Sequence, residues 1–300
     1  MAYARPGSGK TFTMAHKIKL ILDELPEHKG VVAISYTNKA SDELKNRILN
    51  LGVKKKSSFF GTIDKFCLTE IVIPFLRHKF NFSPVEINIT DSKSSQYLEQ
   101  VDININEPMT WETIEKIYKS GEVILELAGR ISVQLLKENQ ILREYLKARF
   151  SHIIVDEYQD SGAEQHSIFC ALHDLGIVAI AVGDLDQSIY AFAGKSSEYL
   201  YELTQRDSFK KFALTKNHRC HSSISAYSLK FLNPDFLAEE VDEKRVYLKE
   251  VNGSISDIVS WIEGAIPSLI AKFSDLKLCE IGVLVRSNNC AKAVRDNSST

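Results

Sequence analysis

Several features are missing from this sequence of 300 residues, and each absence excludes a class of protein. The longest apolar run, Ile177 to Val182, is far shorter than the roughly 20 residues that a transmembrane helix needs. No signal peptide precedes the first motif. We therefore expect a soluble, cytoplasmic protein with no membrane contact.

The sequence also lacks paired cysteine motifs and a large net charge. None of the five cysteines forms a CxxC pair, which argues against a zinc or disulfide framework and indicates reduced, buried and inert thiols. The formal charge of -2 provides no overall basic field, so any contact with nucleic acid must come from a local patch or from stacking on aromatic rings. Apolar residues make up 44%, enough to bury a sizeable core, and the length of 300 residues predicts two globular units or one unit with an insertion.

The first chemical motif is a glycine-containing loop from Ala4 to Thr11. Gly7 and Gly9 would let backbone amides approach phosphates, while Lys10 would supply a positive charge and Thr11 a hydroxyl for Mg²⁺. The helical periodicity that follows would place the phosphates at the positive end of a helix. Only three residues precede the loop, so we expect a clipped first strand or an N-terminal truncation.

The second motif is an apolar strand that ends in two acids. Ile153 to Val155 would be buried, and its carboxyl end would deliver Asp156 and Glu157 into a crevice at the sheet edge. One carboxylate could hold Mg²⁺ and the other could orient a water molecule. Two adjacent acids are common on solvated loops and do not by themselves indicate a catalytic site. This interpretation therefore depends on a phosphate loop at the same edge of the sheet.

Strand and helix patterns alternate along the chain, which predicts an α/β fold with a parallel sheet. The predicted strands are 31–36, 59–62, 152–156 and 177–182. The predicted helices are 11–25, 38–51, 63–80 with a kink or an end at Pro74, and 163–175. Residues 81–149 predict a mainly helical insertion with an apolar stripe that serves packing rather than a partner surface; the stripe consists of Ile114, Ile117, Tyr118, Ile124, Leu127, Ile131 and Leu135. A second unit would begin near 209, with helices at 222–232 and 256–271 and a strand at 281–286.

The two motifs together predict a site for nucleotide hydrolysis. Lys10 and the loop amides would hold the β and γ phosphates, and Thr11 and Asp156 would hold Mg²⁺. Glu157 would then position and deprotonate the attacking water. Two further candidates follow in the chain: Gln187 as a sensor of the γ-phosphate, and Arg219, from the second unit, as an arginine finger.

Seven ordered segments resemble the motifs of the UvrD/Rep-like superfamily 1 DNA helicases. They are ARPGSGKT (4–11), SYTNKASDELKNRI (35–48), GTIDKF (61–66), IIVDEYQD (153–160), VGDLDQSIYAFAG (182–194), LTKNHRC (214–220) and VLVRSN (283–288). GTIDKF followed by TEIVIPF (69–75), together with the short insertion, is most similar to the helicase-like subunits of the Gabija antiphage defence system.

The resemblance implies a RecA-like P-loop NTPase domain, 1A, formed by residues 1–80 and 150–208. Residues 81–149 would be a helical insertion, 1B, and residues 209–300 the incomplete beginning of a second RecA-like domain, 2A. ATP and Mg²⁺ are the implied cofactors. The implied nucleotide-binding residues are Pro6, Gly7, Ser8, Gly9, Lys10, Thr11 and Arg286; the implied catalytic residues are Lys10, Glu157, Gln187 and Arg219; and the implied metal ligands are Thr11 and Asp156.

The resemblance also implies a path for single-stranded DNA. Its residues would be Tyr36, Thr37, Asn38, Thr62, Tyr190 and Phe192. A base stacked on an aromatic ring contributes about 1–3 kcal/mol in such paths. For Tyr190 and Phe192 the alternative is a core position under the strand end. Gln159 would couple the hydrolytic site to the DNA path, and the run Lys54 to Lys56 is either a solvated loop face or a contact to the phosphate backbone.

Three positions depart from the family pattern. Arg5 replaces a glycine of the phosphate loop, Asp64 stands where a histidine is common, and Ala193 stands where an arginine often follows the aromatic residue. The last two changes weaken the expected grip on DNA. The glutamine motif that reads adenine is absent upstream, and motifs V and VI would lie beyond Thr300.

Two hypotheses for function follow. In the first, the chain is an ATP-dependent motor subunit that acts on single-stranded or end-containing DNA, with an OLD-like nuclease and ATPase subunit as its partner in antiphage defence. In the second, it is a non-motor subunit that binds nucleotide and DNA only to regulate the partner nuclease. DNA-stimulated ATP turnover discriminates between them.

Overall fold

The computed structural model describes residues 2–4, 7–101, 103–184, 198–236, 245–273 and 275–298. It forms two compact units, Met1–Cys220 and His221–Thr300. The predicted start of the second unit, near 209, lies too early in the sequence, because strand β8 (Phe212–Leu214) pairs with the sheet of the first unit.

The first unit is built on a six-stranded, wholly parallel sheet, which confirms the predicted α/β fold. The order is β3 (Phe59–Gly61), β2 (Gly30–Ile34), β6 (Phe150–Val155), β7 (Val178–Gly183), β1 (Ala2–Ala4) and β8. The three residues of β1 suffice for a strand because they lie between β7 and β8 and pair with both. All carboxyl ends therefore meet at one edge of the sheet, where ligands bind in open α/β sheets.

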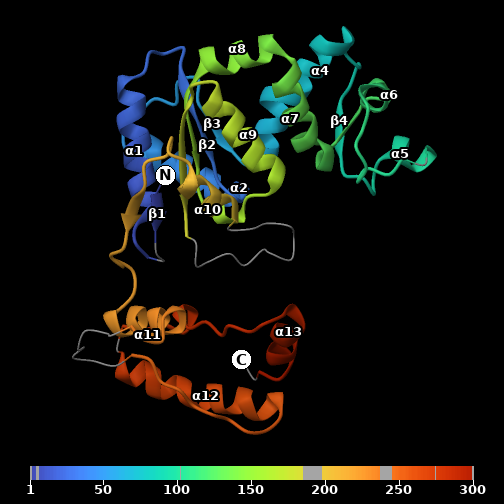
Figure 1. Cartoon of the computed structure of the whole chain (residues 1–300). Helices are drawn as coiled ribbons and strands as arrows, with labels where there is room; N and C mark the ends of the chain where they lie inside the picture. Colours follow the sequence, from blue (N-terminus) through green and yellow to red (C-terminus); the bar gives the residue numbers. More distant parts are fainter. Residues whose placement is uncertain are drawn as a thin grey trace. The chain divides into compact units, whose positions relative to one another are not determined.

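Both faces of the sheet are buried, as expected for parallel strands. On β2, Val31 and Ala33 pack with the helices α1 (Lys10–Glu24) and α2 (Asn38–Asn50), whereas Val32 and Ile34 face the opposite core. Figure 1 shows α1 on one side of the sheet and α9 (Ala163–Asp174) on the other. Burial of each such side chain contributes about 1.5–3 kcal/mol, so the two cores fix the strand ends that carry the site.

The predicted helix 63–80 is interrupted at its proline. It consists of α3 (Ile63–Phe66), a π-helical turn, η1 (Cys67–Val72), and α4 (Ile73–Phe80), with Pro74 in the first turn of α4. Proline lacks an N–H and its ring collides with the carbonyl four residues earlier in a regular helix. The wider turn relieves this conflict, because the N–H of Ile73 bonds to the carbonyl of Leu68, five residues back.

Residues 81–149 share the core of the first unit. They form β4 (Asn88–Thr90), α5 (Gln96–Gln100), α6 (Trp111–Lys119), β5 (Glu122–Ile124), η2 (Leu125–Leu127), α7 (Ala128–Glu138) and α8 (Gln140–Arg149). The apolar stripe is buried and joins the cluster that contains Val32, which confirms its packing role. Ile124, however, lies on a strand rather than on a helix. In Figure 1 the segment with β4, α5 and α6 lies away from α1.

The remaining elements of the first unit surround the acidic motif. The 3-10 turn η3 (Tyr158–Asp160) follows β6, and α10 (Glu198–Gln205) precedes β8.

Of the cysteines, Cys67 and Cys170 are buried as expected, but Cys220, Cys279 and Cys290 are exposed, so the prediction of buried thiols was wrong for three of the five. No helix in the described part of the chain is long and apolar enough to span a membrane.

The second unit consists of helices in the residues described. They are α11 (Ser222–Leu232), α12 (Ile255–Lys272), η5 (Leu278–Glu280) and α13 (Asn288–Asp296), and the first two confirm the predicted helices. The predicted strand 281–286 was wrong: this segment is irregular, and Leu284 is 98% exposed. A strand needs a hydrogen-bonded neighbour, and the described part of the second unit contains no strand with which 281–286 could pair. A second RecA-like domain therefore stays a prediction.

Candidate functional site

The phosphate loop leads into α1 at the carboxyl edge of the sheet. Gly7 and Gly9 have φ values of 71° and 81°, in the left-handed region that favours glycine, and Gly9 caps the amino end of α1. Ser8 is buried, and its Oγ has no hydrogen-bond partner among the described residues. An orphaned buried hydroxyl beside free helix amides fits a loop that binds a phosphate.

A second segment closes over the loop. The N–H of His218 donates to the carbonyl of Gly7 at 2.8 Å. Oδ1 of Asn217 accepts from the N–H groups of Arg219 and Cys220 at 2.8 and 2.9 Å. A Cβ at Gly7 would lie 2.6 Å from Asn217 Oδ1 and 2.9 Å from Arg219 Cβ, so only glycine allows this approach.

This closure brings Arg219 to the phosphate loop, as the predicted role requires. The expectation that Arg219 arrives from the second unit was wrong, because it lies within the first compact unit. Asn217 was missed as a positioning residue, although an asparagine that accepts from amides two and three residues on is a common turn signal.

Asp156 follows β6 and is held by its backbone and its side chain. Its N–H donates to the carbonyl of Ile34 at 2.9 Å, and its Oδ1 accepts from the N–H of Glu157 at 3.0 Å. Burial, and then the neighbouring Glu157 carboxylate, raise the pKa of Asp156 to about 6, while Lys10 opposes the shift. Burial makes the charged form of this carboxylate unfavourable, and a bound cation would stabilise that form. Asp156 is therefore suited to be a metal ligand.

Glu157 is held in a strained turn by two partners. Its φ of 49° lies in the left-handed region, which costs a non-glycine residue about 1 kcal/mol or more. Lys10 Nζ lies 3.2 Å from Glu157 Oε2, and the side chain of Lys10 is only 11% exposed. Gln159 Nε2 donates to the same oxygen at 2.9 Å. The predicted catalytic lysine and glutamate are thus in direct contact.

Gln159 connects this acid pair with the next strand. It is buried, and its Oε1 accepts from the N–H of Asp184, just past β7, at 2.9 Å. One side chain therefore bridges the ends of β6 and β7. This geometry is what the predicted coupling role of Gln159 needs, and the role itself stays a prediction.

The phosphate-loop residues border a cleft of about 370 Å³, called here the phosphate-loop cleft. Its lining residues are Gly7, Ser8, Gly9, Lys10, Thr11, Phe12, Ser35, Tyr36, Ala40, Glu43, Arg47, Asp156, Glu157 and Arg219. The predicted nucleotide, metal and catalytic residues that the structure describes in the first unit all belong to this set. Sequence reasoning assigned no role to Phe12, Glu43 or Arg47, although the last two lie within the motif segment 35–48.

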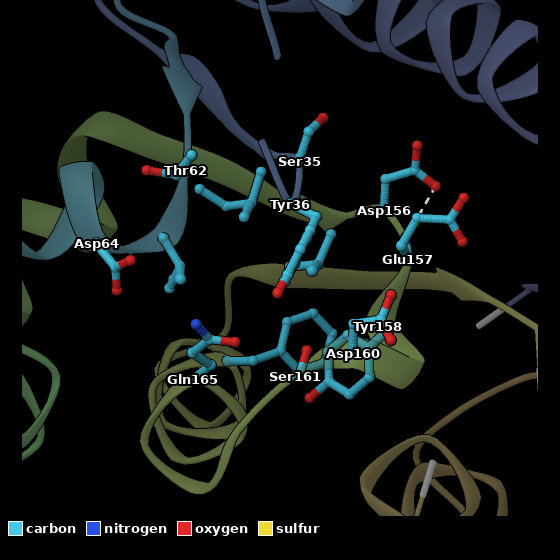
Figure 2. A pocket seen from close by; sticks show the side chains of 14 residues that line it. Ser35, Tyr36, Thr62, Asp64, Asp156, Glu157, Tyr158, Asp160, Ser161 and Gln165 are labelled. Atoms are coloured by element: carbon cyan, nitrogen blue, oxygen red, sulfur yellow. Dashed lines mark hydrogen bonds between the residues drawn. The ribbon is translucent and has the colours of Figure 1, made fainter. Parts of the chain in front are cut away.

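A second cavity of about 230 Å³, called here the Tyr36 pocket, lies beside the acid pair. Figure 2 shows the Tyr36 side chain pointing into it, with Thr62 and Asp64 on one side and Asp156 and Glu157 on the other. Ser35, Tyr36, Asp156 and Glu157 line both cavities. Asp160, the last residue of the acidic motif, also lines the pocket. Sequence reasoning missed Ser161, Gln165 and Phe169, which line it as well.

The predicted DNA-contacting threonines are helix caps. Thr37 Oγ1 accepts from the N–H of Ala40 at 3.1 Å and caps α2, and Thr62 Oγ1 accepts from the N–H of Lys65 at 3.3 Å and caps α3. Each hydroxyl keeps its hydrogen for an outside acceptor. Asn38, at the first position of α2, is exposed.

Other predicted site residues lie elsewhere. Pro6, Gln187, Tyr190 and Phe192 fall outside the described residues, as do Arg5 and Ala193. Arg286 is exposed in the second unit, so its contact with nucleotide stays a prediction. In the lysine run, Lys56 Nζ donates to the carbonyls of Leu22 and Leu25 at the end of α1, which is a structural role.

No group of three or more His, Cys, Asp or Glu side chains that could hold a metal ion occurs among the described residues. Mg²⁺ is usually bound through one or two protein ligands together with substrate phosphates. Thr11 and Asp156, both in the phosphate-loop cleft, suit that pattern.

Comparisons with known proteins agree with this geometry. Residues 1–127 and 109–207 match the family model of the UvrD/REP helicase N-terminal domain. The chain is 30% identical over 296 residues to Gabija protein GajB of Bacillus cereus, covering 96% of this chain and 56% of that protein. It is 26% identical over 356 residues to DNA helicase II of Haemophilus influenzae, covering 99% of this chain and 47% of that protein.

A third relative is the ATP-dependent DNA helicase PcrA of Staphylococcus epidermidis, 27% identical over 267 residues, covering 74% of this chain and 36% of that protein. The chain thus spans about half the length of the relatives it matches, or less.

Proposed function

Because the chain belongs to the UvrD/REP helicase N-terminal domain family, we propose that it binds ATP with Mg²⁺ and hydrolyses it in response to DNA. The DNA is single-stranded or has free ends. The chain is the motor part of a helicase-like protein.

One observation carries this proposal: the phosphate-loop cleft and the Tyr36 pocket share a wall. Ser35, Tyr36, Asp156 and Glu157 line both cavities. An occupant of the Tyr36 pocket therefore touches the same residues that face the nucleotide. This arrangement supports coupling between DNA contact and hydrolysis without any long pathway.

In the proposed site the loop amides and Lys10 hold the phosphates, and Thr11 and Asp156 hold the metal ion. Mg²⁺ would neutralise charge that develops on the phosphate oxygens. Lys10 exchanges Glu157 for phosphate, so that the Glu157 carboxylate is released to orient a water molecule and accept its proton. Arg219, which lines the same cleft, would stabilise the charge that develops on the transferred phosphoryl group.

The proposed DNA path runs along the carboxyl ends of β2 and β3. The ring of Tyr36 provides a stacking surface for a base, and Thr37, Asn38 and Thr62 lie at the positive ends of α2 and α3, which attract phosphate groups. Asp64 borders the same pocket and repels phosphate, so we expect modest affinity for DNA.

The similarity to Gabija protein GajB supports a finer proposal. The chain would work in antiphage defence with an OLD-like nuclease and ATPase subunit of the GajA type. Two experiments test this part separately from the ATPase reaction. One is co-purification of the chain with such a subunit, and the other is a plaque assay that compares cells carrying the wild-type chain with cells carrying Lys10→Ala.

The central test is ATP turnover with and without single-stranded DNA, with Mg²⁺ present. We expect DNA to stimulate the wild-type chain, and Glu157→Gln to lower turnover about 10²- to 10⁴-fold while nucleotide binding persists. Glu164→Gln, an amide substitution on α9, is the matched control and should behave as wild type. Nucleotide and DNA binding without turnover in the wild type would instead support the non-motor subunit.

A further inference from the structure

A chain of hydrogen bonds leads from the turn beside Glu157 to helix α10. Tyr158 Oη lies 2.9 Å from His166 Nδ1, on α9. His166 Nε2 lies 3.3 Å from Glu202 Oε2, on α10, and Glu202 is also bonded to Arg206 at 2.6 Å. The residues come from three elements that are separate in sequence, η3, α9 and α10.

The direction of each bond follows from the chemistry of the groups. Burial lowers the pKa of His166, so its ring is neutral near pH 7. The Glu202 carboxylate only accepts, hence His166 Nε2 carries the proton and donates to it. Nδ1 is then free to accept from the Tyr158 hydroxyl. The hydrogen bonds thus select one tautomer of the ring.

Packing holds the histidine in place around these bonds. The ring of Tyr199, on α10, stacks on His166 with centroids 4.8 Å apart and an interplanar angle of 23°. Cys170 Sγ lies 3.5 Å from Nε2 on the same helix. Tyr158 is 1% exposed and meets the edge of Phe169 at 4.8 Å. The histidine has little freedom to turn away from either partner.

We propose that His166 is a positioning residue for ATP hydrolysis: through Tyr158 it fixes the strained turn that aims Glu157, and it ties that turn to α10. Tyr158 follows Glu157 directly, and the left-handed conformation of Glu157 persists only if its neighbours are held. Gln159 anchors the turn on β7, and His166 anchors it on α10. The inference rests on the proposed hydrolysis of ATP.

Three substitutions separate the two bonds of His166. His166→Asn places an amide oxygen near the position of Nδ1, so it keeps the bond to Tyr158 and loses Glu202. His166→Gln places an amide near the position of Nε2, so it keeps Glu202 and loses Tyr158. Tyr158→Phe removes only the hydroxyl. His173→Asn, on the same helix with its ring against Phe209, is the matched control.

We expect His166→Gln and Tyr158→Phe to lower kcat about tenfold with an unchanged KM for ATP, in line with the loss of one positioning hydrogen bond. His166→Asn should stay within about threefold of wild type, although its melting temperature falls as much as that of His166→Gln. Equal kcat in all variants, or a kcat that follows the melting temperature alone, would overturn the proposal. Wild-type protein without DNA-stimulated turnover would instead contradict the proposed function.

A second measurement does not depend on turnover. Imidazole nitrogen NMR of the wild-type chain should show His166 with a protonated Nε2 and an unprotonated Nδ1, and Tyr158→Phe should shift the Nδ1 signal. A protonated Nδ1 at neutral pH would contradict the proposed hydrogen bond from Tyr158 to His166. It would leave the ATPase proposal intact.

Discussion

The two compact units differ in how their apolar residues are used. The first unit buries side chains on both faces of its sheet, in two clusters that contain residues such as Phe66 and Ile154. In the second unit Val259 is the single buried apolar side chain among the residues described, while Phe231, Trp261 and Leu284 are exposed. Apolar composition alone therefore does not produce a core.

Local signals explain what the second unit does form. Its helices carry caps made by neighbouring residues: Ser287 accepts from the N–H of Cys290 at 3.2 Å, and Asp257 accepts from the N–H of Ser254 at 2.7 Å. Such caps contribute about 1 kcal/mol each and need no distant partner. The difference teaches that helices can be held locally, whereas the catalytic geometry requires the packed sheet.

The largest test of this contrast compares two arginines predicted to face nucleotide, one in each unit. Arg219→Ala should lower kcat for ATP about 10³-fold, because an arginine finger acts on the developing charge. Arg286→Ala should raise the KM for ATP by about tenfold at most, because its contact is with bound nucleotide alone. Steady-state ATP turnover of both variants measures the difference. A larger loss with Arg286→Ala would show that the chemistry depends on the second unit.

A second test compares stability across the units. Phe66 is 0% exposed and packs edge-on against Phe59 and Phe150, so Phe66→Ala should lower the free energy of unfolding by about 3–5 kcal/mol. Leu284→Ala removes a side chain of similar chemistry that is 98% exposed, and the expected change is within about 0.5 kcal/mol. Urea unfolding followed by fluorescence and circular dichroism measures both. A large loss with Leu284→Ala would reveal a core in the second unit.

The same contrast explains what could be predicted from the sequence. The convergence of Lys10, Asp156 and Glu157 followed from apolar strand patterns, because the carboxyl ends of parallel strands meet at one edge. Several helices of both units followed from periodicity and proline, whereas α10 and α13 were not predicted. These signals are local, or depend only on the rule that joins parallel strands.

What sequence reasoning missed depends on approaches between distant segments. The contact of Asn217 with Gly7 joins residues far apart in the chain, and nothing near either residue signals it. The bonds of His166 to Tyr158 and Glu202 arise only when α9 and α10 pack. The predicted strand 281–286 failed for the converse reason, because an apolar pattern without a paired neighbour does not form a sheet.

A third test uses the buried charge at the centre of the first unit. The pKa of Asp156 is about 6 in the folded chain, above its ordinary value of 3.8. Above pH 6 the charged carboxylate therefore destabilises the folded state, and this penalty fades as the pH falls through 6 and disappears below about 4. Asp156→Asn should stabilise the first unit at pH 7.5 by an amount on the order of 1–3 kcal/mol and lose this advantage toward pH 4.

Urea unfolding at several pH values measures this effect, and Mg²⁺-dependent nucleotide binding should be lost in the same variant. Asp174→Asn, at the end of α9, is the control and should show no comparable gain at pH 7.5. A stability gain for Asp156→Asn that does not change with pH would contradict burial of the charge as its cause.

The smallest test applies the same change to one helix cap in each unit. Asn139 Oδ1 accepts from the N–H of Leu142 at 2.9 Å and caps α8, and Ser287 caps α13 in the same manner. Asn139→Ala should lower the free energy of unfolding of the first unit by about 1 kcal/mol, because α8 unfolds together with the core through Leu142 and Leu146. Ser287→Ala should leave that transition unchanged and only increase amide exchange within α13, because the residues that the structure describes in the second unit form no core that links this helix to a cooperative unit. Equal shifts of the main transition would mean that the second unit unfolds together with a core of its own, and the contrast between the units would then fail.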